Sequence, residues 1–393
     1  MSFSSQRAAS LPAYAMARVA AIKRRLLTEG RDVIDLSAGD ADFAPPEIAV
    51  RTLADALRDP AMSRYPHQVG LPAFRDAVAR YMERRFGVRV DPMNEILPLI
   101  GSKEGLAHLA LAVLNPGDVC VIPQPGYPAY LGGATFAGAD PLVYPLTAST
   151  GFLVELDELP ADRLERTRLV YLNYPNNPTT AVAPRDYLER TVACCRERGI
   201  VLAYDNPYCE ITFDGYRAPS VLEIPQARDV AIEFHSFSKS FCMTGWRVAW
   251  AVGNADIIAA LSQVKSWLDT GVFLAVQRAA AAALDAAETI VPGYVEGFRL
   301  RRDVAVAALA EVGFALEPPR ATMYLWVPLP EGVASAELAE RALEDEALAI
   351  MAGAAFGPAG EGYLRIALTV GEDRLREAMT RLQRARERME VHR

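Results

Sequence analysis

Short apolar runs alternate with longer amphipathic segments through the first two thirds of the chain. A run of roughly four to eight apolar residues is typical of a strand buried on both faces, and apolar positions three or four apart are typical of a helix. The apolar runs predict strands at 95–100, 119–122, 142–145, 168–172, 200–204, 230–234 and 247–251. The segments around them predict helices at 12–29, 46–59, 71–86, 102–114, 128–136, 185–198 and 255–286, the last broken near Thr270. Because such strands alternating with helices form a mostly parallel sheet covered on both faces, we expect an α/β fold.

The pattern changes near residue 290. A long charged helix is followed by two short apolar stretches, a second helix, a strand and a last amphipathic helix, at 291–311, 313–316, 322–327, 335–346, 363–368 and 373–390. We therefore expect an N-terminal arm at 1–45 that packs with a smaller α+β domain at 289–393, and a large domain at 46–288.

The composition is that of an ordinary globular protein, since 51% of the 393 residues are hydrophobic and 23% are charged. There are 41 Lys and Arg against 49 Asp and Glu, and the net charge of −8 argues against a broad basic surface for nucleic acid. No window approaches about 18 uninterrupted apolar residues, so the sequence predicts no membrane span. The N-terminal segment lacks the apolar stretch of a secretory signal.

The five cysteines form no CxxC pair, and there are only four histidines. This argues against a zinc site of the usual spacing, and we expect no metal. The odd number of cysteines and the adjacent pair Cys194 and Cys195 fit a reducing compartment. We therefore expect a cytoplasmic protein.

The segment HSFSKSFCMTGWRVAW, 235–250, carries the strongest chemical signal. Lys239 lies between two serines directly after a predicted buried strand, among apolar neighbours. Desolvation lowers the pKa of a lysine, which makes its free amine available for Schiff-base chemistry. The hydroxyls of Ser236 and Ser238 and the guanidinium of Arg247 are suitable donors for a phosphate. The alternative is a loop with a surface lysine.

Three further segments place polar residues at the ends of predicted strands. In YLNYPNNPTT, Asn177 follows the strand at 168–172, at the edge where open α/β sheets bind ligands. In YDNPYCEI, Asp205 ends a strand and Tyr208 follows; such an aspartate pairs with a protonated ring nitrogen or caps a turn. In IGSKEGLAHL, Ser102 begins a helix whose free backbone N–H groups either bind phosphate or are simply capped.

Together these segments resemble the fold-type I pyridoxal-phosphate (PLP) aminotransferases of class I/II, over roughly residues 12 to 385. A closer resemblance, to the LL-diaminopimelate aminotransferase-like branch, rests on the stretches RRFGVRVDPMNEILPLIGSKEGLAHLALAVLNPGD, PQPGYPAY, LNYPNNPT, FDGYRAPS and IEFHSFSKSFCMTGWR. The resemblance implies a mostly parallel seven-stranded sheet between helices, with a smaller α+β domain.

The resemblance also implies a role for each cofactor-binding residue. Lys239 resembles the lysine that binds PLP covalently and moves the proton, and Asp205 the partner of the pyridinium nitrogen. Tyr208 and Asn177 resemble the hydrogen-bond partners of the ring oxygen, and Tyr127 the aromatic residue stacked on the ring. The phosphate is expected on Ser102, Lys103, Ser236, Ser238 and Arg247.

Four more residues are expected on the substrate side or from a second subunit. Arg365, in GYLRIALT, resembles the arginine that binds the substrate α-carboxylate, and Gly39 lies where a backbone amide meets that carboxylate. Tyr14 resembles a substrate-side tyrosine. Tyr65 resembles the tyrosine that crosses to the neighbouring subunit's phosphate, so the resemblance implies a homodimer with shared active sites; a buried loop aromatic is the alternative for Tyr65.

The chain departs from the branch pattern at four places. Thr180 replaces the glycine of the usual NPTG, and the loop after Leu36 reads SAGDADF. Asn206-Pro207 follows Asp205, where small or acidic residues are usual, and Leu274 stands where relatives often carry a polar residue. These departures concern the substrate side more than the cofactor.

The resemblance implies a ping-pong transaminase that moves an amino group from an L-amino acid to a 2-oxo acid, with 2-oxoglutarate as the expected acceptor. LL-diaminopimelate is one donor; alanine, aspartate, methionine or an aromatic amino acid are others. A β-lyase, decarboxylase or oxidase on the same scaffold is an alternative that shares every cofactor residue. A sensor domain of a transcription regulator is disfavoured, because only about eleven residues precede the first predicted helix and the chain is acidic.

Overall fold

The computed structural model describes residues 3–12 and 15–391. A seven-stranded sheet has the order β2-β8-β7-β6-β5-β3-β4. Its strands are β2 (Ile96–Leu99), β3 (Val119–Gln124), β4 (Asp140–Pro145), β5 (Thr167–Asn173), β6 (Val201–Asp205), β7 (Ala231–Ser236) and β8 (Ala249–Gly253). Strand β8 is antiparallel to both of its neighbours, and the remaining pairings are parallel. The expected mostly parallel α/β sheet is confirmed.

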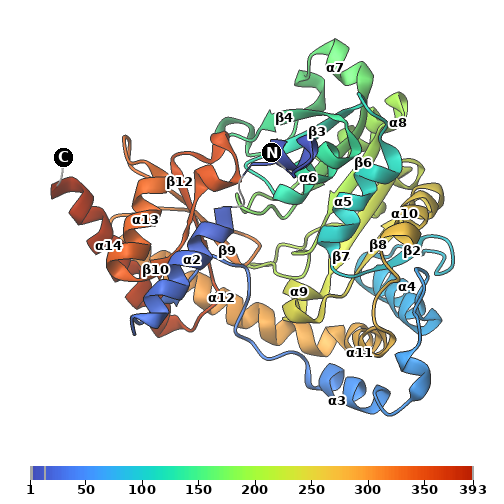
Figure 1. Ribbon diagram of the computed structural model, residues 1–393, viewed down its shortest axis with the longest axis horizontal. Coiled ribbons are helices and arrows are strands. Elements are labelled where there is room, and N and C mark those ends of the chain that lie inside the picture. The colour runs from blue at the N-terminus through green and yellow to red at the C-terminus, as the bar shows by residue number, and fades with distance from the viewer. Residues whose placement is uncertain (1–2, 13–14, 392–393) are drawn as a thin grey trace.

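Helices cover both faces of this sheet (Figure 1). The large part of the chain contains α3 (Glu47–Ala56), α4 (Pro72–Phe86), α5 (Ser102–Val113), α6 (Pro128–Ala137), α7 (Ala161–Arg166), α8 (Arg185–Arg198), α9 (Phe237–Ser240), α10 (Ala255–Leu268) and α11 (Leu274–Asp285). On β5, Leu169 and Tyr171 pack with α5, α6 and α10, whereas Val170 and Leu172 belong to the core beneath α4, α8 and α11. This two-sided burial explains why the strands are continuous apolar runs.

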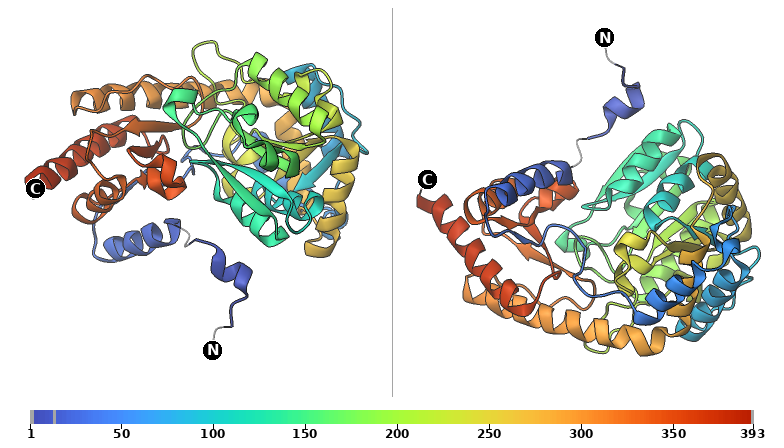
Figure 2. Two further views of the ribbon diagram at one scale, coloured as in Figure 1. Left: turned by 90° about the horizontal axis from the view of Figure 1, so that it is seen from above. Right: turned by 60° about the horizontal axis from the view of Figure 1, so that its bottom comes forward.

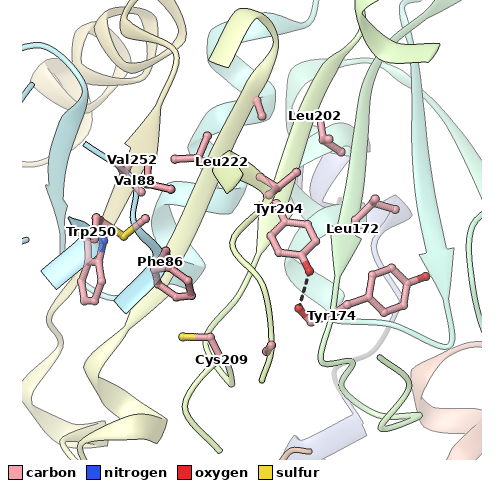
Figure 3. Close-up of a cluster of buried hydrophobic side chains, with 14 of the residues drawn as sticks. Phe86, Val88, Leu172, Tyr174, Leu202, Tyr204, Cys209, Leu222, Trp250 and Val252 are labelled. Atoms are coloured by element: carbon pink, nitrogen blue, oxygen red, sulfur yellow. Dashed lines mark hydrogen bonds between the residues drawn. The ribbon is translucent and has the colours of Figure 1, made fainter. Parts of the chain in front are cut away.

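Figure 3 shows part of the second of these cores, in which aromatic and aliphatic side chains of β5, β6 and β8 meet. The Tyr204 hydroxyl donates a hydrogen bond to the backbone oxygen of Tyr174 at 2.8 Å. The buried phenol therefore keeps a partner inside an otherwise apolar layer.

A smaller unit follows the long helix α12 (Ala287–Glu311), which runs from beside α11 to the far side of the molecule (Figure 1). An antiparallel sheet β11-β12-β9 and a parallel pair β1-β10 form its centre. Its elements are β1 (Ile34–Asp35), β9 (Tyr324–Pro328), β10 (Leu348–Ala349), β11 (Met351–Ala352), β12 (Tyr363–Ala367), α13 (Ser335–Glu346) and α14 (Glu372–Val391).

Helix α2 (Ala15–Thr28) lies against this smaller unit, and its Leu26 packs with Leu343 of α13. Helix α1 (Gln6–Ser10), which precedes it, extends away from the smaller unit (Figure 2). Strand β1 pairs with β10, so residues far apart in sequence share one small sheet. Short 3-10 segments complete the chain at Pro60–Ser63, Ala148–Thr150, Leu156–Glu158, Val221–Glu223, Ala227–Asp229, Thr244–Trp246, Gly353–Phe356 and Pro358–Gly360.

Two details differ from the expected elements. The apolar stretch 313–316 has no regular structure and links α12 to the loop before β9. Helix α12 begins at Ala287, four residues before the expected start, and contains Pro292 in its second turn, where the missing N–H removes one backbone hydrogen bond. Among the described residues, no helix has the length and apolarity needed to cross a bilayer.

Candidate active site

A cavity of about 620 Å³ lies at the carboxyl ends of β3, β5, β6 and β7, beneath residues of β9, β11 and β12. The carboxyl edge of an open α/β sheet is the usual position for a ligand. Most of the residues singled out in the sequence line this cavity, namely Gly39, Ser102, Lys103, Tyr127, Asn177, Asp205, Tyr208, Ser236, Ser238, Lys239, Arg247 and Arg365.

The Asp205 carboxylate, at the end of β6, lies in an apolar environment. One oxygen, Oδ2, accepts a hydrogen bond from the Tyr130 hydroxyl at 2.6 Å. The other, Oδ1, is buried without a hydrogen-bond partner among the described residues. Burial raises the pKa of Asp205 from 3.8 to about 7, although the Tyr130 hydrogen bond acts in the opposite direction. A buried, unpaired carboxylate oxygen in a cavity is suited to a cationic N–H group of a ligand.

Lys239 projects into the same cavity from the short helix α9 (Phe237–Ser240). Its ammonium group donates a hydrogen bond to the backbone oxygen of Gly39. The surrounding helix is held by buried apolar residues, since Phe237 and Phe241 are almost completely buried. The amine is therefore fixed in position between the sheet and the loop that carries Gly39.

The start of α5 and the segment after β7 form a cluster of donors at one end of the cavity. Ser102 is the first residue of α5, where backbone N–H groups are free to bind an anion. Ser236 and Ser238 line the cavity beside it, and the Ser236 hydroxyl accepts from the Ser238 N–H at 3.1 Å. A Cβ atom at Gly101 would lie 2.1 Å from the Arg247 guanidinium, so only glycine lets Arg247 approach. This end of the cavity is suited to a phosphate.

Arg365 lies at another side of the cavity, on β12. Its Nη1 donates to Asn177 Oδ1 at 2.8 Å, and its Nη2 donates to the backbone oxygen of Ser37. Asn173 accepts from the Asn177 N–H at 2.8 Å and donates to the backbone oxygen of Asp205 at 2.7 Å. A continuous set of hydrogen bonds therefore joins Asp205 to Arg365. The guanidinium, 5% exposed, is suited to binding a carboxylate.

Comparison with known proteins gives the family. The model of aminotransferase class I and II matches residues 31–382. The chain belongs to the aminotransferase class I and II family. Enzymes of this family use PLP, and the chain is a PLP-dependent transaminase.

The most similar curated proteins include two LL-diaminopimelate aminotransferases. The one from Desulforudis audaxviator is 47% identical over 383 residues, covering 97% of this chain and 98% of that protein. The one from Syntrophobacter fumaroxidans is 44% identical and covers 95% and 96%. Among solved structures, substrate-bound BacF from Bacillus subtilis has a TM-score of 0.94 at 33% identity, with 98% of both chains covered. A probable N-succinyldiaminopimelate aminotransferase from Thermus thermophilus has a TM-score of 0.89 at 39% identity, covering 94% and 99%.

The cavity of this aminotransferase fits PLP on three independent features. The unpaired oxygen of Asp205 is suited to the pyridinium nitrogen. The donors around Ser102 and Arg247 are suited to the phosphate. The Lys239 amine lines the same cavity as these groups and Arg365.

Of the expected site residues that the structure describes, Tyr65 does not line the cavity. Tyr65 is 75% exposed and belongs to the loop between the 3-10 segment Pro60–Ser63 and α4. An outward position is compatible with the expected contact to a second subunit, which stays a prediction. Tyr14 lies outside the described residues.

The departures from the branch pattern have structural counterparts. Thr180 has φ +63°, so it adopts the left-handed conformation that a glycine would adopt there. Asn206 donates to the buried Glu233 carboxylate at 2.8 Å and to the backbone oxygen of Pro219 at 3.1 Å. Leu274 is the buried first residue of α11 and does not line the cavity.

Two tyrosines of the site were missed by the sequence analysis. Tyr130, in PGYPAY, holds Asp205, and its ring stacks on Tyr171 at 4.6 Å. Tyr324, in MYLW, lines the cavity next to Tyr208 and Arg365. A tyrosine beside apolar residues in a strand is typical of a core position, so neither motif signalled its contact.

Proposed function

We propose that this aminotransferase takes the amino group of LL-diaminopimelate and transfers it to 2-oxoglutarate. The donor is supported by the curated relatives of 42–47% identity, which carry this activity in their names. The observation that carries the transaminase chemistry is the meeting of Lys239, the unpaired Asp205 oxygen and Arg365 in one cavity.

In the proposed arrangement, Asp205 holds the pyridinium nitrogen of PLP, Tyr208 and Asn177 hold its ring oxygen, and Tyr127 covers one ring face. The phosphate is held by the start of α5 with Lys103, Ser236, Ser238 and Arg247. When bound, PLP supplies an electron sink for the bond that breaks at the substrate Cα. Lys239 would hold and move the proton, because its amine lies in the cavity, where it donates to the backbone oxygen of Gly39.

Arg365 binds the substrate α-carboxylate with its planar pair of N–H donors. Asn177 and Ser37 hold the guanidinium in place, so the carboxylate arrives in one orientation. A carboxylate held in this way would present the substrate Cα in one orientation to the Lys239 amine. Arg365 would therefore keep the carboxylate bound while the Cα proton is removed.

We also propose a homodimer with shared active sites, in which Tyr65 reaches the partner's phosphate site. The 75% exposure of Tyr65 supports this, since an aromatic side chain this exposed is suited to an interface. We further propose that the large region 46–288 and the smaller region 289–393 act as two domains around the cavity. A cytoplasmic location is supported by the five free cysteines.

A second candidate donor is an apolar or aromatic amino acid. The wall of the cavity includes Met16, Ile122, Leu131, Met351 and Phe356, which are apolar. The second ammonium and carboxylate of LL-diaminopimelate would need polar partners there, and in a dimer the second chain is the place for them. Without them, the wall favours an apolar side chain.

A half-reaction assay discriminates between the two donors. Purified protein with bound PLP is mixed with LL-diaminopimelate, glutamate, phenylalanine or methionine, one at a time, and the cofactor absorbance is followed. Rapid conversion to the pyridoxamine form with LL-diaminopimelate and glutamate supports the proposal. Rapid conversion with phenylalanine or methionine and none with LL-diaminopimelate favours the second candidate. The variant Lys239→Ala is the control and is expected to convert with none of them.

A further inference from the structure

Tyr324 touches two groups of the active site at once. It is the first residue of β9, and only 2% of its surface is exposed. Its hydroxyl lies 3.1 Å from the Tyr208 hydroxyl, and the two rings meet edge-on at 5.6 Å. Its ring lies beneath the Arg365 guanidinium, with the guanidinium carbon 4.4 Å from the ring centroid. Tyr324 therefore stands between the expected cofactor side and the expected carboxylate side of the cavity.

The ring of Tyr324 supports Arg365 together with one other aromatic residue. Phe356 also lies against the guanidinium: the guanidinium carbon is 4.6 Å from the centroid of the Phe356 ring. A guanidinium over an aromatic face is stabilised by the charge distribution of the ring, most strongly at desolvated sites. The rings contact the face of the guanidinium, and the N–H groups at its edge donate hydrogen bonds to Asn177 and Ser37.

The loop above Tyr324 is shaped to leave room for its hydroxyl. A Cβ atom at Gly39 would lie 2.0 Å from the Tyr324 oxygen and 3.3 Å from the Lys239 nitrogen. No side chain larger than hydrogen fits at Gly39 without displacing the phenol. The close approach of backbone, phenol and lysine is thus built into the cavity.

The charged and titratable groups around the phenol come from three other segments. Tyr208 follows β6, Lys239 belongs to α9 and Arg365 to β12. Burial disfavours the phenolate, but the positive charges of Lys239 and Arg365 lower the pKa of Tyr324 below its ordinary value. A phenol polarised in this way is a stronger hydrogen-bond donor.

We propose that Tyr324 is a positioning residue for transamination, whose hydroxyl orients the Tyr208 hydroxyl and whose ring orients the Arg365 guanidinium. The proposal rests on the roles of Tyr208 and Arg365 in the proposed function. Its two parts are separable, because phenylalanine keeps the ring and leucine keeps neither the ring nor the hydroxyl.

The first experiment tests the hydroxyl. In the protein with bound PLP and no substrate, the visible absorption band of the cofactor is titrated with pH. A hydroxyl that accepts a hydrogen bond from Tyr324 donates more strongly to the ring oxygen of the cofactor, which favours the deprotonated form. In Tyr324→Phe we expect the midpoint of this titration to rise by about half a pH unit. An unchanged midpoint overturns the role of the hydroxyl.

The second experiment tests the ring. Binding of succinate, a carboxylate that cannot react, is measured from its perturbation of the same absorption band. Tyr324→Phe is expected to bind succinate as the wild type does, and Tyr324→Leu about tenfold more weakly. In the glutamate half-reaction, the same loss should appear in the substrate concentration needed for half-maximal rate. Wild-type affinity in Tyr324→Leu overturns the role of the ring.

Tyr216→Phe is the matched control. The Tyr216 hydroxyl is buried without a hydrogen-bond partner among the described residues, and the residue does not line the cavity. This variant is expected to leave both the midpoint and the succinate affinity unchanged. Neither measurement depends on which amino acid is the donor. The proposal about Tyr324 can therefore fail while LL-diaminopimelate remains the substrate, and LL-diaminopimelate can fail as the substrate while the role of Tyr324 holds.

Discussion

At the scale of single residues, burial of the Asp205 carboxylate at the proposed cofactor site lowers the stability of the cofactor-free protein. Its folded-state pKa of about 7 lies above the ordinary value of 3.8. The folded form therefore holds its proton more tightly than the unfolded chain. The resulting loss in the free energy of unfolding is small below pH 4, grows as the pH rises towards 7 and reaches its full value above pH 7. A cationic ring nitrogen bound to the carboxylate would offset it.

The first prediction concerns Asp205→Asn in the cofactor-free protein. Because an amide has no charge to bury, we expect the variant to be more stable than the wild type at pH 8, by about 2–4 kcal/mol. The advantage should shrink as the pH is lowered to 5. Urea denaturation at both pH values measures it, with the exposed Asp162→Asn as control. With PLP added, the variant is expected to lose cofactor that the wild type retains. A cofactor-free variant less stable than the wild type at pH 8 would contradict the argument.

The second prediction concerns Thr180, a β-branched residue in the left-handed region at φ +63°. This conformation costs a non-glycine residue about 1–2 kcal/mol, and glycine loses about 0.5–1 kcal/mol of chain entropy in exchange. We expect Thr180→Gly to raise the free energy of unfolding by about 0.5–1 kcal/mol, measured with urea. Thr180→Ala is the control and should gain less, because alanine keeps the Cβ atom. Equal stability of Thr180→Gly and the wild type would show that the turn carries no such strain.

The site residues that the sequence identified share a reason for being identifiable. Lys239, Asp205 and Asn177 are polar groups placed directly after apolar strands, so each departs from its surroundings in the sequence. Tyr130 and Tyr324 do not differ from their neighbours in the sequence in this way, since a tyrosine is common in a buried strand or helix. Their roles depend on contacts between segments far apart, such as Tyr130 with Asp205, and appear only in three dimensions.

At the scale of elements, the sequence predicted where helices and strands lie along the chain better than it predicted the direction in which a strand runs in the sheet. Helix α8 begins after Pro184 and ends before Gly199 at φ +64°, and the expected bounds 185–198 were correct because both signals are local. The antiparallel direction of β8 has no such signal, because a continuous apolar run looks the same in the sequence whether the strand is parallel or antiparallel to its neighbours. The stretch 313–316, expected only as a short apolar segment, forms no regular element.

The third prediction concerns the connection between α5 and α10. Lys265 of α10 is fully buried, and its ammonium lies 2.5 Å from Glu104 of α5 and 2.9 Å from Asp269. Glu104 also accepts from the Ile100 N–H at 3.0 Å, just before the phosphate-binding end of α5. Removing one partner of a buried ion pair leaves uncompensated charge. We expect Lys265→Met to lower the free energy of unfolding by about 3–5 kcal/mol and to weaken PLP retention.

The matched control for Lys265 is Lys23→Met. Lys23 pairs with Asp35 at 2.6 Å, but a third of its side chain is exposed. Such a pair contributes about 1 kcal/mol or less. Urea denaturation of both variants compares the two sites. Similar losses would mean that the buried cluster is not a special anchor of α5.

At the scale of the whole molecule, one apolar surface remains open. Tyr65, Val69, Trp267 and Leu268 are 75%, 52%, 83% and 53% exposed. The two segments that carry them lie side by side, because Gln68 donates to the backbone oxygen of Asp269 at 3.3 Å. A Cβ atom at Gly271 would lie 2.4 Å from the backbone oxygen of His67, which again requires close packing of the two loops. A surface of this kind is typical of a protein–protein interface.

The fourth prediction is that this surface is the dimer interface. Trp267→Glu places a charge where the proposed dimer buries an indole, so we expect monomers in sedimentation velocity and faster loss of PLP, because Tyr65 then no longer reaches the partner's phosphate site. Met93→Glu is the control: Met93 is 63% exposed, but it precedes β2 beside the start of α10, whereas Trp267 lies in the last turn of that helix. The control should remain a dimer. A dimeric Trp267→Glu that retains PLP as the wild type does would move the interface elsewhere and leave the exposed Tyr65 without its proposed partner.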